Sequence, residues 1–144
     1  MEALQEALRF GWIDGQARSV DESWYEQRFT PRRPRSIWSK RNRGFAEALI
    51  EAGRMEPAGL REVERAKADG RCDAAYDAPS TATVPDDLRA ALDASPEAAA
   101  FFATLNAQNR YAILHRIQTA RRPETRARRI ATFVAMLKRG ETIH

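Results

Sequence analysis

The sequence predicts a mainly α-helical fold of the α+β class, with about six to seven short helices and one β-hairpin near the N-terminus. Apolar residues recur every three to four positions over most of the 144-residue chain, and one early segment changes to aromatic and β-branched residues. Prolines and glycines stand where helices would begin and end. The length predicts one domain over residues 1–144, in which the hairpin and first helices occupy 1–76 and a helical half occupies 77–144.

The first elements follow from this pattern. Residues 2–10 predict a short helix that ends at Gly11, since glycine suits a helix C-terminus. Residues 13–20 and 24–30 predict two strands, because turn-forming residues from Asp21 to Ser23 separate them.

The next helices follow two prolines, Pro31 and Pro34, which exclude regular structure until about Ser36. One helical face then runs from Trp38 to Ala52 at spacings of three and four, and Gly53 ends it. Another helix starts at Pro57 and stops at Gly70.

Residues 78–84 form a loop-like stretch before the second half of the chain. Four helix starts follow it, at Pro85, Ser95–Pro96, Asn106 and Pro123, and the last helix ends before Gly140.

Composition excludes several classes of protein. Mean hydropathy is −0.61 and the apolar runs are short, so no membrane insertion is expected. The N-terminus lacks the apolar stretch of a signal peptide, which predicts a cytoplasmic protein. One cysteine and two histidines cannot build a common zinc site, and no nucleotide-binding fingerprint is present, so neither a metal nor a cofactor is expected.

Positive charge is concentrated between residues 28 and 43, where there are seven basic residues and no acidic one. Arginine outnumbers lysine 21 to 3 in the whole chain, which suits forked recognition of phosphate or carboxylate, although a GC-rich genome would also explain it. A second basic run extends from Arg110 to Arg129.

The basic and aromatic block is therefore the candidate site for an anion. We expect arginines and a helix N-terminus near Ser36 or Ser39 to bind a phosphate-containing ligand or nucleic acid, with Trp38 as a stacking surface or wall. The predicted ligand-binding residues are Arg28, Arg32, Arg33, Arg35, Ser36, Trp38, Ser39 and Asn42. The structural alternative is that a serine caps the helix, Trp38 packs in the core and the arginines are solvated.

Three residues of the first strand are predicted to support this site: Trp12, Asp14 and Gly15. Asp14 is expected to orient arginines of the block, and its alternative roles are a simple Asp-Gly turn or a general base. Cys72 and His115 are interpreted as inert and as a helix-surface residue, respectively. The Arg121–Arg126 segment is interpreted as a solvated helix entry, with a second phosphate-contacting patch as the alternative.

Several motifs together resemble a known family, the bacteriocin-protection or YdeI/OmpD-associated (OmdA-like) proteins. The motifs are Phe10–Gly15, Arg28–Arg32, Ser36, Trp38–Ser39, Asn42, Gly53–Met55, Pro57–Gly59, Val84–Leu88 and Arg121–Arg126. The resemblance implies a role in stress or bacteriocin resistance and supplies no catalytic residues. It also implies that members carry roughly fifty more N-terminal residues with a strand-like segment, without which the hairpin exposes an edge. Cys72 stands where the family has tryptophan.

The function expected from these observations is a cytoplasmic stress-protection or binding protein with an anion-recognising surface. Two alternatives stay open. One is an interaction module that completes its sheet at the hairpin edge with a protein partner or a second copy. The other is an enzyme that uses Asp14 or Glu26 as an acid or base on a small anionic substrate.

Overall fold

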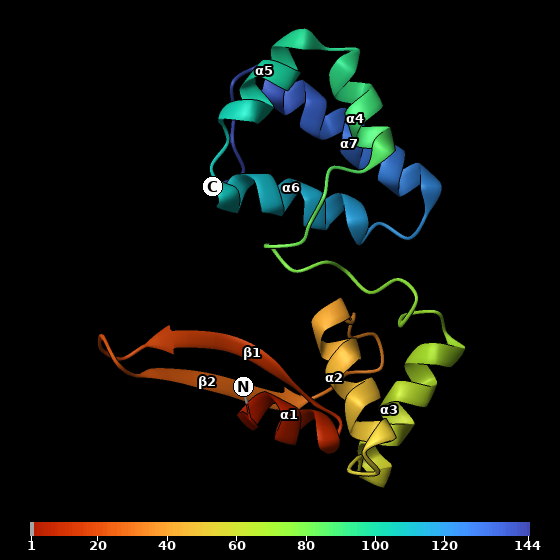
Figure 1. The fold of residues 1–144 in the computed structure, drawn as a ribbon. Coiled ribbons are helices and arrows are strands. Elements are labelled where there is room, and N and C mark those ends of the chain that lie inside the picture. The colour runs from red at the N-terminus through yellow and green to blue at the C-terminus, as the bar shows by residue number, and fades with distance from the viewer. Residues whose placement is uncertain (1) are drawn as a thin grey trace. The chain divides into compact units, whose positions relative to one another are not determined.

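The computed structural model, which describes residues 2–144, confirms a mainly α-helical fold with one antiparallel hairpin (Figure 1). The chain divides into two compact units, residues 1–75 (the N-terminal unit) and residues 76–144 (the C-terminal unit). Each unit has its own cluster of buried apolar side chains.

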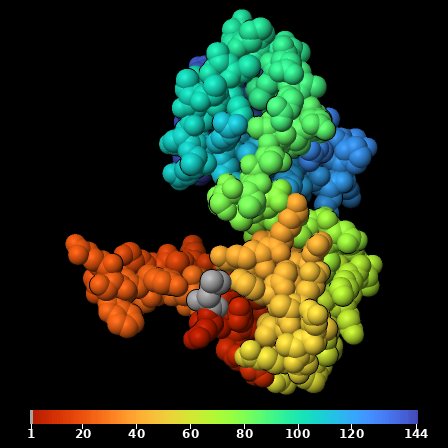
Figure 2. All heavy atoms as spheres, in the orientation of Figure 1, coloured from red at the N-terminus to blue at the C-terminus, as the bar shows by residue number. Residues whose placement is uncertain are grey.

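The N-terminal unit combines three helices with the hairpin. Its elements are α1 (Glu2–Arg9), β1 (Trp12–Ser19), β2 (Tyr25–Pro31), α2 (Lys40–Glu51) and α3 (Pro57–Ala68). Leu4 and Leu8 of α1 are buried in one cluster with Leu49 of α2 and Val63 of α3. The hairpin projects away from these helices, so most of its side chains are exposed (Figure 2).

The Asp21 side chain helps to hold the turn of the hairpin. The Oδ1 atom of Asp21 accepts hydrogen bonds from the backbone N–H groups of Ser23 (2.8 Å) and Trp24 (2.9 Å). This is the local bonding that makes aspartate a turn residue, and it fixes the register in which Ser19 pairs with Tyr25.

A bulge interrupts the hairpin in the middle of β1. Asp14 pairs with Phe29 and Ala17 pairs with Gln27, so Gly15 and Gln16 together lie opposite the single residue Arg28. The Nε2 atom of Gln27 donates to the carbonyl oxygen of Gly15 at 3.0 Å. Bulges of this kind bend a strand and redirect its side chains.

Helix α2 begins at the later of the two serines near which the sequence places its start. Lys40 is the first helical residue and Ser39 is the N-cap, whereas Ser36 is not followed by helix. Ser36 closes a turn instead: its Oγ atom accepts from the backbone N–H of Arg33 at 3.0 Å, and its own N–H donates to the Arg33 carbonyl.

The C-terminal unit is a four-helix arrangement. It contains α4 (Asp86–Asp93), α5 (Pro96–Thr104), α6 (Ala107–Gln118) and α7 (Pro123–Lys138). The sequence placed these starts correctly: prolines open α5 and α7, and the Oδ1 atom of Asn106 accepts from Asn109 N–H at the N-cap of α6. No helix within residues 2–144 is long and apolar enough to cross a bilayer.

Packing is tight where the end of α1 meets the start of α3. A Cβ atom at Gly59 would clash with the carbonyl oxygen of Arg9 and the sulfur of Met55. Gly11 ends α1 with a φ of +77°, a conformation that glycine adopts without strain. The end of α1 therefore lies directly against the backbone of α3 at Gly59, a contact that leaves no room for a side chain there.

We expect Gly59→Ala to lower the free energy of unfolding of the N-terminal unit by about 2–3 kcal/mol, because the added methyl group overpacks this contact. All three tryptophans lie in that unit, so tryptophan fluorescence during urea denaturation reports on it alone. The matched control is Gly44→Ala in α2, where an added Cβ meets nothing within 4 Å. This control should leave stability unchanged or raise it by up to about 1 kcal/mol. An equal effect of both substitutions would contradict the packing described here.

Candidate anion-binding site

A groove of about 360 Å³ lies along one face of the hairpin and the loop that follows it. We call it the hairpin groove. It is lined by Ile13, Gly15, Gln16, Arg28, Thr30, Pro31, Arg33 and Ser36. Side chains alternate between the two faces of a strand, so Arg28 and Thr30 of β2 share this face with Ile13 of β1.

The hairpin groove is basic. Two exposed arginines, Arg28 and Arg33, line it, and no aspartate or glutamate does. The turn between Arg33 and Ser36 fixes the backbone from which the Arg33 side chain extends. A guanidinium group offers forked hydrogen-bond donors, and no acidic side chain in the lining balances the charge of these two arginines. Such a surface suits a phosphate or carboxylate ligand.

Arg32 and Trp38 lie in the interior of the N-terminal unit. The Arg32 side chain lies over the Trp38 ring with its Cζ atom 3.6 Å from the ring centroid, and the two residues are 6% and 2% exposed. Arg32 also donates from Nη1 to the Ile37 carbonyl and from its backbone N–H to the Gly11 carbonyl. The burial of Trp38 leaves its ring no open face on which a ligand could stack.

Ser39 and Asn42 are occupied at the start of α2. The Oγ atom of Ser39 caps the helix by accepting from the Asn42 N–H at 3.1 Å, and both residues are buried. This helix N-terminus is therefore closed by the chain itself, as the structural alternative for the serines expects.

Asp14 supports α2 and lies outside the hairpin groove. Its Oδ1 atom accepts from Asn42 Nδ2 at 3.2 Å, and its Oδ2 atom lies 3.7 Å from Arg41 Nη2. The first turn of α2 has no acidic residue and begins with Lys40 and Arg41. The carboxylate from β1 thus supplies negative charge at the positive end of the helix dipole.

The remaining predicted residues are divided between surfaces. Arg35 is exposed in the loop without lining the groove, and Gly15 contributes to its wall. Trp12 lines a separate apolar pocket with Phe10 and Phe29. Asp14 lines another pocket, to which Trp12 does not contribute. Glu26 forms an exposed ion pair with Arg18 at 2.8 Å.

The predicted site did not include the support given by Arg71 or four of the lining residues, Ile13, Gln16, Thr30 and Pro31. Thr30 follows Arg28 by two positions, so strand alternation alone would have found it. Arg71 is buried, pairs with Asp69 at 2.7 Å and donates to the Ser36 carbonyl at 2.9 Å. No local pattern marks a contact across 35 residues of chain.

Cys72 and His115 belong to different units. Burial raises the pKa of the Cys72 thiol above its usual 9.0, which disfavours the nucleophilic thiolate. His115 packs edge-on against the ring of Tyr76 and close to Tyr111. Burial, followed by the charges of Arg116 and Arg129, lowers the pKa of His115 below 6.5. Within residues 2–144, no three potential metal ligands are grouped to hold an ion.

Two family models match separate parts of the chain. Residues 81–140 match the family described as "Bacteriocin-protection, YdeI or OmpD-Associated" (OmdA). The resemblance to the OmdA family is confirmed for this segment. This match covers α4 to α7 and includes the motifs Val84–Leu88 and Arg121–Arg126.

The motifs of the hairpin region lie in a segment that matches a different family model. Residues 1–62 match a model described as "Domain of unknown function (DUF8412)". No curated protein and no solved structure matches the chain significantly. The OmdA match thus relates the C-terminal unit to bacteriocin-protection proteins, whereas the hairpin groove lies in the segment whose family has no assigned function.

The placement of adjacent arginines gives a direct test. We expect Arg32→Ala to lower the free energy of unfolding of the N-terminal unit by about 2 kcal/mol, because it removes a desolvated cation–π contact and buried packing. Arg33→Ala is the matched control and should change stability by less than about 0.5 kcal/mol. Both are measured by urea denaturation with tryptophan fluorescence, and a larger effect of Arg33→Ala would show that the wrong arginine has been placed inside.

The stability of the C-terminal unit is expected to depend on pH through His115. The folded state holds the pKa of His115 below its usual 6.5, so the unfolded chain binds more protons between the two pKa values. We therefore expect the C-terminal unit to lose stability as the pH falls through 6.5 towards the folded pKa, with no further loss from this group at lower pH.

The measurement is denaturation at pH values of about 7.5 and 5.5. Circular dichroism follows the unfolding of both units, and tryptophan fluorescence follows the N-terminal unit, so the difference between them reports on the C-terminal unit. His115→Gln should reduce the pH dependence of the C-terminal unit. An NMR titration in which His115 has a pKa above 6.5 would reverse the expected sign.

Proposed function

We propose that the N-terminal unit binds phosphate groups of nucleic acid or nucleotides in the hairpin groove. The observation that carries the proposal is the pair of exposed arginines, Arg28 and Arg33, in a groove lined by no acidic side chain. The Ser36 hydroxyl and the Gln16 side chain add neutral donors to the same lining. A cytoplasmic location, as the sequence predicts, would give access to these ligands.

The proposal revises which residues are expected to bind. Arg28, Arg33 and Ser36 line the groove and Arg35 extends the basic surface beside it. Arg32 positions this loop by packing on Trp38, and it is a supporting residue in this scheme.

A second function is supported by the tip of the hairpin. Val20, Trp24 and Tyr25 are 57%, 72% and 66% exposed, which is unusual for large apolar side chains that lie together. In the described part of the chain, β1 and β2 form a sheet of two strands, so each strand has an outer edge. We therefore retain an interaction module that pairs with a protein strand as the alternative to anion binding.

Binding is best tested with labelled single-stranded DNA and RNA, inorganic phosphate and nucleotides across a range of salt concentrations. Because each phosphate contact contributes about 0.7–0.9 to the log–log salt slope, we expect Arg28→Ala/Arg33→Ala to lower the slope by about 1.5 and to weaken binding. Fluorescence anisotropy measures the polymers and a thermal shift measures the small ligands.

The matched control is Arg18→Ala, which removes an arginine of the same hairpin that pairs with Glu26 and does not line the groove. It should retain the affinity and the salt slope of the unaltered protein. Salt-insensitive binding, an equal loss in the control, or no binding of any anion would reject the proposal and favour the interaction module.

A further inference from the structure

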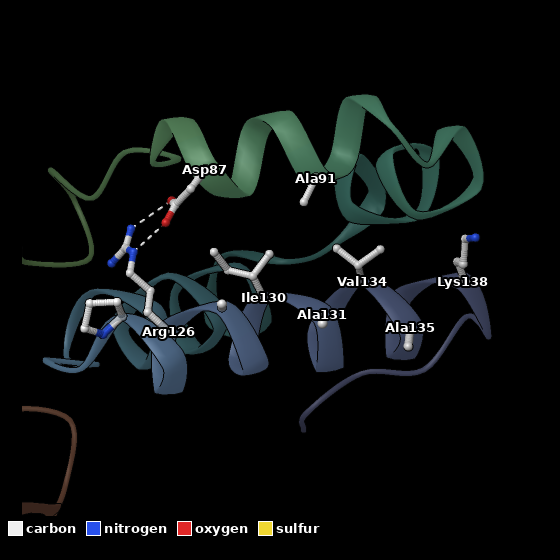
Figure 3. Close-up of a pocket in the computed structure, with 10 residues that line it drawn as sticks. Asp87, Ala91, Arg126, Ile130, Ala131, Val134, Ala135 and Lys138 are labelled. Atoms are coloured by element: carbon white, nitrogen blue, oxygen red, sulfur yellow. Dashed lines mark hydrogen bonds and ion pairs between the residues drawn. The ribbon is translucent and has the colours of Figure 1, made fainter.

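The C-terminal unit has an open groove of about 680 Å³ between α4 and α7 (Figure 3). Its floor and walls are mostly apolar. The lining residues are Asp87, Ala91, Pro123, Arg126, Ala127, Ile130, Ala131, Val134, Ala135 and Lys138.

Three alanines of α7, Ala127, Ala131 and Ala135, are exposed along this groove at spacings of four residues. Residues four apart share one helix face, so the alanines form a single row. Ala91 faces the row from α4 (Figure 3). Where contacting side chains are small, two helices can approach closely, so the alanine row suits packing against one further helix.

The two ends of this face carry opposite charge. Glu124 lies seven residues before Ala131 and Lys138 lies seven residues after it, and both are exposed. Lys138 makes a long contact with Glu97, at 4.0 Å between two exposed side chains. The ion pair of Asp87 with Arg126, at 2.5 and 2.9 Å, lies at the end of the groove nearer Glu124.

We propose that two copies of the chain associate through antiparallel α7 helices, with a two-fold axis passing beside Ala131. In this arrangement Ala127 of one copy faces Ala135 of the other, and Glu124 faces Lys138 at both ends. The occupant is a second copy because the complementary charges are the two ends of the same helix, which is the property that an isologous interface requires.

The same geometry places Arg128 opposite Val134, since they lie three residues on either side of Ala131. The methylene stem of arginine covers apolar surface while its charged end stays in water. The proposal does not depend on anion binding, because the α4–α7 groove and the hairpin groove lie in different units.

Charge reversal tests the antiparallel register. Sedimentation velocity from about 10 to 300 μM should show a concentration-dependent dimer for the unaltered protein. Glu124→Lys and Lys138→Glu should each weaken the dimer by about tenfold or more, because each places like charges opposite one another twice. The double variant should recover most of the affinity. The proposal is overturned if the protein stays monomeric, which is the result expected if the groove binds another protein or nothing. It is also overturned if the double variant does not recover the affinity of the dimer.

The two-fold axis is tested by cross-linking. In a Cys72→Ser background, Ala131→Cys should form an intermolecular disulfide with oxidised glutathione, because only residues close to the axis bring their own copies within disulfide distance. Ala103→Cys, at an exposed alanine of α5, is the matched control and should remain reduced. Equal cross-linking of both variants would reject the axis, and circular dichroism of each variant confirms that it is folded.

Discussion

The packing of Arg32 on Trp38 is the contact on which the arrangement of the basic segment depends. Arg32 directly follows β2, and Trp38 precedes the N-cap of α2, so their contact closes the loop between hairpin and helix. The Arg32 N–H also bonds to the Gly11 carbonyl, which links the same loop to the end of α1. With Arg32 turned inward, its neighbour Arg33 faces the hairpin groove. The burial of Arg32 thus makes it a supporting residue of the fold and leaves Arg33 exposed for contact with a ligand.

Much of the fold could be predicted because its signals are local. Asp21 forms the hairpin turn with its own neighbours, and the starts of α5, α6 and α7 depend on Pro96, Asn106 and Pro123. The start of α2 was ambiguous since Ser36 and Ser39 are both good capping residues, and only Ser39 is followed by helix. Trp38 and Asn42 are four residues apart, as on one helical face, although Trp38 precedes the helix.

The site was harder to predict than the fold, because it depends on which residues of a charged segment become buried. Consecutive arginines 32 and 33 have the same chemistry and opposite environments, and the difference comes from tertiary contacts with Gly11 and Trp38. The partners of Asp14 are likewise at the start of α2 and not within the hairpin. The bulge at Gly15 and Gln16, which shapes the groove, leaves no distinct signal in the sequence apart from the glycine.

A dimer joined through α7 carries two N-terminal units, and therefore two hairpin grooves, in one assembly. Two weak phosphate sites that engage one nucleic-acid strand bind with an effective concentration set by their connection, so the assembly gains affinity without any new contact. A mononucleotide, which fills one groove at a time, gains nothing from the second. Dimerisation through α7 would thus favour polymeric over monomeric phosphate ligands, although the residues of each hairpin groove stay the same.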